Sequence, residues 1–149
     1  MKSLSPRDRL TAICQIRHTR EVAGDLEPKE LVWIGSSQRD LRSFPEEVKD
    51  VMGYALFQAQ LGRKAPSAKP LAGFGGAGVL EIIDDFQKNT YRAVYTVKFS
   101  DLVYVLHVFQ KKSKKGIATP KAEVDLINAR LKFAEQDYKA RSKRVKAKQ

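Results

Sequence analysis

Clustered basic residues are the feature of this sequence that most clearly suggests a chemistry. Lys111, Lys112, Lys114 and Lys115 lie within five residues in "FQKKSKKG". Like charges this close repel one another unless water or an anion screens them. The cluster follows an apolar run that predicts a strand, so the lysines should gather at one end of that strand. They are either a solvated loop or an edge that binds the phosphate groups of an RNA backbone.

A second candidate group stands on two neighbouring predicted strands. Glu81 lies inside the apolar run "VLEIIDDF", and Arg92 lies inside "TYRAVYTVKF". A carboxylate inside an apolar strand costs free energy unless it is paired, and Arg92 is placed to be its partner. The two residues form either a simple cross-strand salt bridge or part of a catalytic site. Arg92 and Lys98 share one face of their strand, which we expect to be open to solvent.

The histidines and the cysteine offer less chemistry. His107, in "VYVLHVF", has Val105 and Phe109 on its own face if the strand is regular. We interpret it as a hydrogen-bonded packing residue, with a role as general acid or base as the alternative. His18 has no visible partner. The single cysteine, Cys14, argues against a disulfide framework or a Cys-rich zinc site, and we expect no metal and a reducing, cytoplasmic environment.

The segment "GFGGAG", Gly73 to Gly78, has the G-x-G-x-x-G spacing of dinucleotide-binding loops. Such a loop needs a strand before it and a helix after it, because the phosphate binds at the N-terminus of that helix. Here a Pro- and Lys-rich loop precedes the glycines and a predicted strand from Val79 follows them. We therefore interpret the segment as a glycine hinge, while Lys64 and Lys69 in the same loop keep a weaker role in contacting a phosphate backbone.

Length and charge limit the class of protein. The chain has 149 residues, enough for one domain with its own core. Its 28 basic and 17 acidic residues give a net charge of +11, which favours a polyanionic partner such as nucleic acid or an acidic protein. The N-terminus lacks the long apolar core of a secretory signal, and no segment approaches the roughly 18 to 20 apolar residues of a membrane span. We expect a soluble protein with no membrane partner.

Hydrophobic periodicity predicts the elements that position these residues. A short strand covers Glu30 to Gly35, and its continuously apolar centre suggests that both of its faces are covered. A helix that begins after Ser36 must end near Phe44, because Pro45 restricts the residue before it. A second helix then runs from Pro45 to a stop at Gly62. Its buried face should consist of Val48, Val51, Met52, Ala55, Leu56 and Ala59.

The second half of the chain predicts a small sheet and a final helix. Residues 62–78 are loop-like, and three segments rich in Val, Ile, Tyr and Phe follow, so we expect an antiparallel meander. Thr119 and Pro120 predict the cap and first position of the final helix. The apolar face of this helix should be Val124, Ile127, Leu131, Ala134 and Tyr138. The last eleven residues, "KARSKRVKAKQ", carry six basic groups and no acid, and should fray into a basic tail.

The order of these elements, together with four stretches of sequence, resembles a known family. From about Glu30 to Tyr138 the chain resembles the phage-derived, HigB-like toxins of the RelE/ParE superfamily of bacterial toxin–antitoxin systems. The similarity lies in "WIGSSQRDLRSFPEEV", "AKPLAGFGGAGVLEI", "TYRAVYTV" and above all "VYVLHVFQKKSKKGIATPKAEVDLINARL". It implies an α+β, RelE-like fold with an N-terminal strand, two helices, an antiparallel three-stranded meander and a C-terminal helix. The toxin domain then covers 29–141, between an N-terminal extension at 1–28, with one short helix around Arg9 to Ile16, and a basic tail at 142–149.

The resemblance implies an mRNA interferase, a ribosome-dependent endoribonuclease that needs no metal or other cofactor. In this chemistry the ribose 2′-OH attacks its own phosphate, so the protein has to move protons and stabilise charge on the phosphate oxygens. Arg92 falls on the family's phosphate-stabilising arginine in the pattern "YRxxY", and Lys111 and Lys112 fall on the basic end of the last strand. Glu81 matches an acid of the HigB-like branch and is the candidate base, with a lysine or His107 as the candidate acid.

The same resemblance implies the remaining contacts of the protein. Lys114, Lys115, Lys69 and His107 are expected to bind substrate. The implied partners are mRNA, the ribosome and a cognate antitoxin with a helix-turn-helix domain of the HigA type, with which an oligomer is expected. Two alternatives stay open: a ParE-like toxin that poisons DNA gyrase, and a non-catalytic RNA-binding module.

Overall fold

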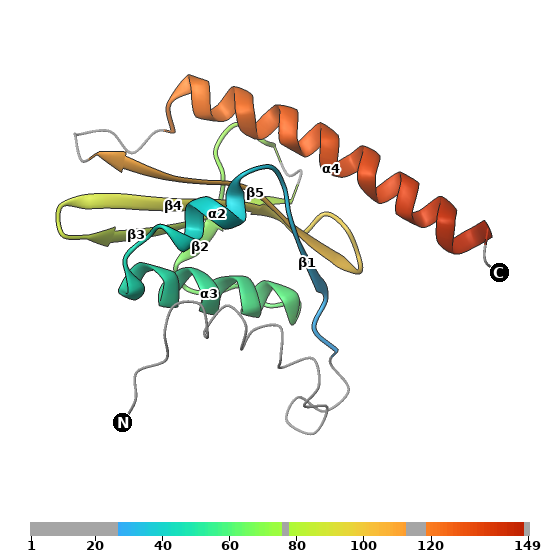
Figure 1. Ribbon diagram of the computed structural model, residues 1–149, viewed down its shortest axis with the longest axis horizontal. Helices are drawn as coiled ribbons and strands as arrows, with labels where there is room; N and C mark the ends of the chain where they lie inside the picture. Colours follow the sequence, from blue (N-terminus) through green and yellow to red (C-terminus); the bar gives the residue numbers. More distant parts are fainter. Residues whose placement is uncertain (1–26, 76–77, 113–118, 148–149) are drawn as a thin grey trace.

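The computed structural model describes residues 27–75, 78–112 and 119–147 of the chain. Within them the elements follow in the order β1, α2, α3, β2, β3, β4, β5 and α4 (Figure 1). Residues 1–26 of the expected extension lie outside the described residues, and the short helix expected around Arg9 to Ile16 lies among them. Lys114 and Lys115 lie outside the described residues as well. None of the helices in the described part of the chain is both long enough and apolar enough to cross a membrane.

One mixed sheet of five strands forms the centre of the fold, in the order β1-β5-β4-β3-β2. Its strands are β1 (Glu30–Trp33), β2 (Ala68–Pro70), β3 (Val79–Phe86), β4 (Asn89–Thr96) and β5 (Leu102–Lys112). The predicted antiparallel meander of β3, β4 and β5 is confirmed, and β1 adds to it in parallel with β5. The short strand β2 was not predicted, because its three residues lie in a Pro- and Lys-rich loop that has no alternating pattern.

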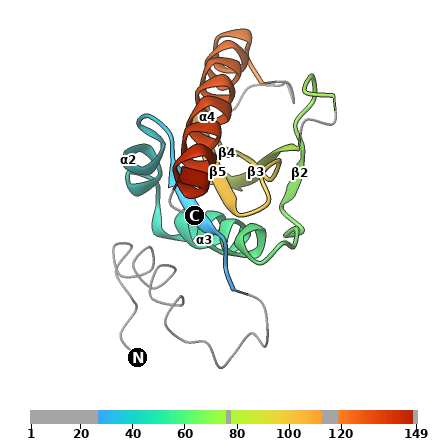
Figure 2. The same ribbon diagram turned by 90° about the vertical axis from the view of Figure 1, so that its right-hand side faces the viewer.

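Helices cover the sheet on both faces, so the domain has three layers (Figures 1 and 2). The helices α2 (Ser37–Arg42) and α3 (Glu46–Gln60) lie on one side, as the break at Pro45 predicts. The long helix α4 (Lys121–Ala147) crosses the other side. The predicted α+β class, with an N-terminal strand, two helices, a meander and a C-terminal helix, is therefore confirmed.

Two apolar cores hold these layers together. The first lies between α3 and the sheet, where five of the six residues predicted for the helix face are buried and Val51 is partly buried. Gly62 ends this helix region with a φ of +79°, a left-handed conformation that glycine adopts without strain. The second core lies under α4, where Ile127, Leu131 and Ala134 pack on Tyr104 and Leu106 of β5. Each face of the sheet thus packs against its own helix layer.

A β-bulge in β5 changes which side chains face α4. The β4–β5 register shifts between Val94, which pairs with His107, and Tyr95, which pairs with Val105, so Leu106 is the extra residue. Val105 therefore belongs to the core under α3, whereas Phe109 belongs to the core under α4. The expectation that His107 shares its face with both residues holds for Phe109 and is wrong for Val105. A bulge cannot be recognised in the run Leu102–Phe109, because this run is apolar almost throughout and has no alternation that an extra residue would interrupt.

The helix α4 corrects two further expectations. The face of β4 that carries Arg92 is buried rather than open to solvent, with Arg92 3% exposed and Thr96 fully buried. The C-terminal residues that we expected to fray continue as helix to Ala147. Arg141 there donates to Asp137 one turn earlier, and basic groups near a helix C-terminus interact favourably with its dipole, so both effects stabilise this extension.

Candidate functional site

A buried ion pair joins the two predicted site residues on the central strands. Nη1 of Arg92 lies 3.1 Å from Oε2 of Glu81, and their side chains are 4% and 5% exposed. Ile83 of β3 pairs with Arg92, and Glu81 pairs with Val94, so the guanidinium reaches diagonally across the ladder. The predicted pairing of these two side chains is confirmed. The pair lies on the face that α4 covers, because Val94 belongs to the core under α4.

Two more side chains complete this group. Lys69, opposite Glu81 on the short strand β2, brings its Nζ to 3.8 Å from Oε1 of Glu81 and is half exposed. Thr119, just before α4, accepts a hydrogen bond of 3.0 Å from Nη1 of Arg92. Thr119 was predicted as a helix cap, and its role as a partner of Arg92 was not predicted. We call Lys69, Glu81, Arg92 and Thr119 the Arg92 cluster.

The basic end of β5 lies near this cluster. Arg92 pairs with Phe109, and Lys111 stands two residues further along β5, opposite Thr90. Lys111 is partly exposed, and Lys112 ends the strand opposite Asn89. The structure thus brings Lys111, and the backbone of Lys112, to the end of the sheet nearest Arg92. Lys114 and Lys115 lie outside the described residues, so their place relative to this end stays a prediction.

His107 lies in a second polar group, which we call the His107 cluster. Its Nε2 contacts Oε2 of Glu123, and its Nδ1 lies 3.2 Å from Nη1 of Arg130, both from α4. Because an arginine only donates, Nδ1 must accept, and Nε2 then carries the proton that it donates to Glu123. The ring is also stacked on Phe109, with centroids 4.9 Å apart. Both nitrogens are occupied, which agrees with the interpretation of His107 as a hydrogen-bonded packing residue.

The His107 cluster extends to the start of the domain through Arg130. Its Nη1 also donates to the carbonyl of Leu106, at 3.0 Å, and its Nη2 donates to Oγ of Ser36, at 3.4 Å. Gly35 has a φ of +58°, and a Cβ on it would lie 2.9 Å from the Arg130 guanidinium. Gly35, two residues after the end of β1, therefore makes room for an arginine almost a hundred residues later. This group fixes α4 against β5 and α2.

Sequence reasoning missed Glu123 and Arg130. The available signal was their spacing, since residues seven apart lie on one side of a helix, with the buried Ile127 between them. Charged residues that flank a predicted apolar face are candidates for contacts with the neighbouring layer. Here the contact is made to the bulge at Leu106, which the sequence pattern does not reveal.

The two clusters share one face of the sheet. Glu81, Val94 and His107 stand opposite one another on β3, β4 and β5. Two strand spacings, about 10 Å, therefore separate Glu81 from His107, with Val94 between them. Among residues 27–75, 78–112 and 119–147, no three His, Cys, Asp or Glu side chains gather as metal ligands.

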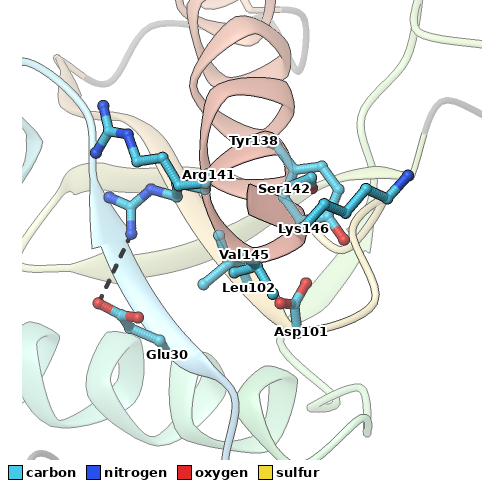
Figure 3. Close-up of a pocket in the computed structure, with 9 residues that line it drawn as sticks. Glu30, Asp101, Leu102, Tyr138, Arg141, Ser142, Val145 and Lys146 are labelled. Carbon is cyan, nitrogen blue, oxygen red and sulfur yellow. Dashed lines mark ion pairs between the residues drawn. The ribbon is translucent and has the colours of Figure 1, made fainter. Parts of the chain in front are cut away.

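An open pocket of about 580 Å³ lies at the other end of β5, away from Lys111 (Figure 3). The last turns of α4 form one wall, with Tyr138, Arg141 and Val145, and Leu102 and Glu30 line the strand side. Nη1 of Arg141 lies 4.0 Å from Oε1 of Glu30. The pocket has both acidic and basic residues at its rim, and none of the predicted site residues lines it.

A hydrogen-bonded pair supports α4 beside this pocket. The hydroxyl of Tyr104 donates to Oδ2 of Asp137 at 2.8 Å, and Nε of Arg141 donates to the same oxygen at 2.7 Å. Burial raises the pKa of Asp137, but these hydrogen bonds to its charged form outweigh burial and lower the pKa below its ordinary value. Burial and the bond to Asp137 raise the pKa of Tyr104 well above its ordinary range. Asp137 is therefore ionised and Tyr104 neutral at pH 7.

Comparison with known proteins identifies the family of the chain. Residues 39–132 match the family described as "Phage derived protein Gp49-like (DUF891)". The chain belongs to this family. The region that matches the Gp49-like family runs from α2 into α4 and contains Glu81, Arg92 and His107.

One solved structure is also similar to this Gp49-like chain. It is a chain of the toxin–antitoxin complex RelBE2 from Mycobacterium tuberculosis, with 20% sequence identity and a TM-score of 0.40. The similarity covers 58% of the Gp49-like chain and 94% of the other chain. No curated protein matches the sequence.

Proposed function

We propose that the chain is the toxin of a type II toxin–antitoxin system and that it cleaves messenger RNA on the ribosome. The observation that carries this proposal is the Arg92 cluster, in which the guanidinium of Arg92 and the ammonium group of Lys69 each lie within 4 Å of the Glu81 carboxylate. These are the groups that phosphoryl-transfer chemistry without a metal requires: a proton acceptor, cations for the phosphate oxygens and a proton donor. Membership of a phage-derived family and the net charge of +11 agree with it.

The proposed reaction is an attack of the ribose 2′-oxygen on the adjacent phosphorus. The 2′-oxygen forms a bond to phosphorus and gives its proton to Glu81, while the bond to the 5′-oxygen breaks and that oxygen takes a proton from a lysine. The products are a 2′,3′-cyclic phosphate and a 5′-hydroxyl end. Arg92 stabilises the charge that builds up on the non-bridging oxygens. Lys69 and Lys111, which are more exposed than His107, are better placed to meet a substrate as donors.

Substrate binding requires a rearrangement of the Arg92 cluster. Arg92 is almost fully buried, and its Nη1 donates to both Glu81 and Thr119. A phosphate that binds Nη1 has to take the place of Thr119 or share this nitrogen with Glu81. Replacing Thr119 leaves the acid and the arginine together, so we propose this exchange. It moves the start of α4 away from β4 when RNA enters.

The burial of Arg92 also supports a second reading, a non-catalytic RNA-binding module in which the ion pair is purely structural. A ParE-like gyrase poison is the third reading, since the same resemblance implies it.

We propose that a HigA-like antitoxin neutralises the toxin in an oligomeric complex, and that the toxin acts in the cytoplasm, where mRNA and ribosomes are found. The division of the chain into an extension at 1–28, a toxin domain at 29–141 and a tail at 142–149 stays part of this proposal.

The experiment is induced expression of the chain alone in bacterial cells, with growth and mRNA followed together. Wild type should arrest growth and produce cleaved, translated mRNA, and Arg92→Lys, which keeps a positive charge beside Glu81, should relieve the arrest while the protein stays folded. Arrest with intact mRNA and accumulating DNA breaks would show gyrase poisoning instead. RNA binding without arrest would show the non-catalytic module.

A further inference from the structure

The outer face of α4 carries a second stripe, apolar at five of its six positions and separate from the one that packs on the sheet. The stripe follows a spacing of four, three, four, three and four residues. Its members, all exposed, are Ala122, Leu126, Ala129, Phe133, Gln136 and Ala140. Leu126 is 37% exposed and Phe133 is 56% exposed. We call these six residues the α4 seam.

This spacing is that of the a and d positions of a coiled coil. In this register Leu126, Phe133 and Ala140 occupy a, and Ala122, Ala129 and Gln136 occupy d. Single exposed apolar residues are common on protein surfaces and need no explanation. A seam that keeps one register from Ala122 to Ala140, on a helix whose core-facing residues already hold it to the sheet, is a different case. The seam is not needed for the contact of α4 with its own domain.

The position of α4 leaves the seam accessible. Figures 1 and 2 show α4 as an outer layer, with the sheet on one side of it only. With 27 residues the helix is about 40 Å long, enough to offer a full groove to another helix. Among the described residues no other element covers the seam, since all six positions are exposed.

Charges beside the seam indicate what would bind there. On one flank Lys132, Lys139 and Lys146 recur every seven residues at the g position, all exposed, and only Asp125 in the first heptad departs from this pattern. On the other flank the first three e positions turn toward the body of the domain, and the fourth, Arg144, is exposed. The side chains of the first three hold contacts there: Glu123 and Arg130 with His107, and Asp137 with Tyr104. The flank that faces a partner is therefore basic.

We propose that the α4 seam docks an amphipathic α-helix of a partner protein, with apolar residues at its own a and d positions and acidic residues beside them. Charges at e and g set partner choice in coiled coils, and the row of lysines selects glutamate and aspartate. A second copy of this chain fits less well, because it would bring a second row of lysines and Arg144 to the interface. A nucleic acid would use the lysines but not the apolar seam. The proposal does not depend on RNA cleavage.

The test uses the full-length protein and a fluorescein-labelled synthetic helix of about four heptads, with Leu at a and d and Glu at e and g. The glutamates keep this peptide from pairing with itself. Fluorescence anisotropy should show saturable binding that weakens as salt rises. Phe133→Asp, and separately the double variant Lys132→Glu with Lys139→Glu, should each weaken binding by about tenfold or more. The same peptide with Lys in place of Glu should not bind.

Matched variants control for general effects. Tyr54→Asp changes an aromatic residue of similar exposure, 59%, on α3, and Arg63→Glu with Lys88→Glu makes the same charge change elsewhere. Both should bind the peptide as wild type does, and all variants should unfold at the wild-type temperature, because every changed residue is exposed.

Three results would overturn the proposal. The first is no saturable binding of the acidic peptide, or equal binding by wild type and Phe133→Asp. The second is a dimer of the wild-type protein that Phe133→Asp abolishes, which assigns the seam to a second copy. The third is a single-stranded oligouridylate that binds at the seam more tightly than the peptide and is lost in Phe133→Asp. Whether Phe133→Asp arrests growth is measured separately, and this measurement tests the proposed toxin activity rather than the binding of a partner helix.

Discussion

Arg92 and Glu81 form a salt bridge of 3.1 Å with both side chains almost completely out of water. Such a pair gains strong attraction but has lost the hydration of two charges, so its net contribution to stability is small. Removing one partner is different, because the other is left as a buried, uncompensated charge. The same contact therefore governs the stability of the domain, and in the proposed function it also holds the base, Glu81, beside Arg92.

The first prediction concerns the stability of this pair. Arg92→Ala should lower the free energy of unfolding by about 3–5 kcal/mol, because Glu81 is left buried without its main partner. The double variant Glu81→Leu with Arg92→Leu should recover most of this loss, since two apolar side chains replace two desolvated charges. Urea unfolding followed by circular dichroism measures both values.

Lys98 offers the control for this measurement. Its salt bridge to Glu135 is 2.8 Å long, but the side chains of Lys98 and Glu135 are 45% and 35% exposed, so Lys98→Ala should cost about 1 kcal/mol or less. An Arg92→Ala loss no larger than that of Lys98→Ala would mean that the Arg92–Glu81 pair is not desolvated as described. The double variant also separates folding from toxicity, because it should fold and yet not arrest growth.

The second prediction concerns Lys69. Because this lysine is half exposed and 3.8 Å from Glu81, Lys69→Ala should change the free energy of unfolding by about 1 kcal/mol or less. Its loss should nevertheless slow RNA cleavage by about tenfold or more, because one cation of the Arg92 cluster is gone. Lys64→Ala, at an exposed lysine in the loop before β2, is the comparison. If both variants cleave at the same rate, Lys69 has no special role.

The third prediction concerns His107 and Glu123. A double-mutant cycle with His107→Ala and Glu123→Ala should give a coupling energy of about 1–3 kcal/mol, since the two side chains are direct partners between β5 and α4. Cleavage by the two single variants, measured well below their unfolding temperatures, should persist. Loss of cleavage by folded His107→Ala would instead make this histidine the general acid.

The fourth prediction is a pH dependence that arises from Asp137. Its folded pKa is lower than the ordinary value of 3.8, so its hydrogen bonds stabilise the fold above that pH. This stabilisation is lost as the pH falls through 3.8 toward the lower folded pKa. Asp137→Asn should be less stable than wild type at pH 7, and the difference should shrink in acid. A difference that stays constant between pH 7 and pH 3 would contradict the assignment.

The layered fold could be predicted because most elements follow simple periods. The three- and four-residue spacing of α3, the break at Pro45 and the density of Val, Ile, Tyr and Phe in β3 and β4 each depend on neighbours in sequence. The Glu81–Arg92 contact could be predicted for a related reason. An acid in an apolar strand requires a partner, and the next strand of a meander is the nearest place to find one.

What could not be predicted depends on contacts between distant residues. The bulge at Leu106, the three-residue strand β2 and the contact of Arg130 with Gly35 arise from packing between layers. The burial of Arg92 has the same origin, because α4 covers a face that looks polar when β4 is considered alone. A partly polar strand does not show whether a helix from elsewhere in the chain will cover it.

The central claim, that this Gp49-like protein cuts translated mRNA through the Arg92 cluster, is tested most directly by mapping the 5′ ends of a reporter transcript in a reconstituted translation reaction. With wild-type protein we expect new 5′ ends, bearing hydroxyl groups, that require ribosomes on the message, and with Arg92→Lys we expect none. Full-length transcript in the presence of folded wild-type protein, or the same cleavage pattern with Arg92→Lys, would contradict the claim.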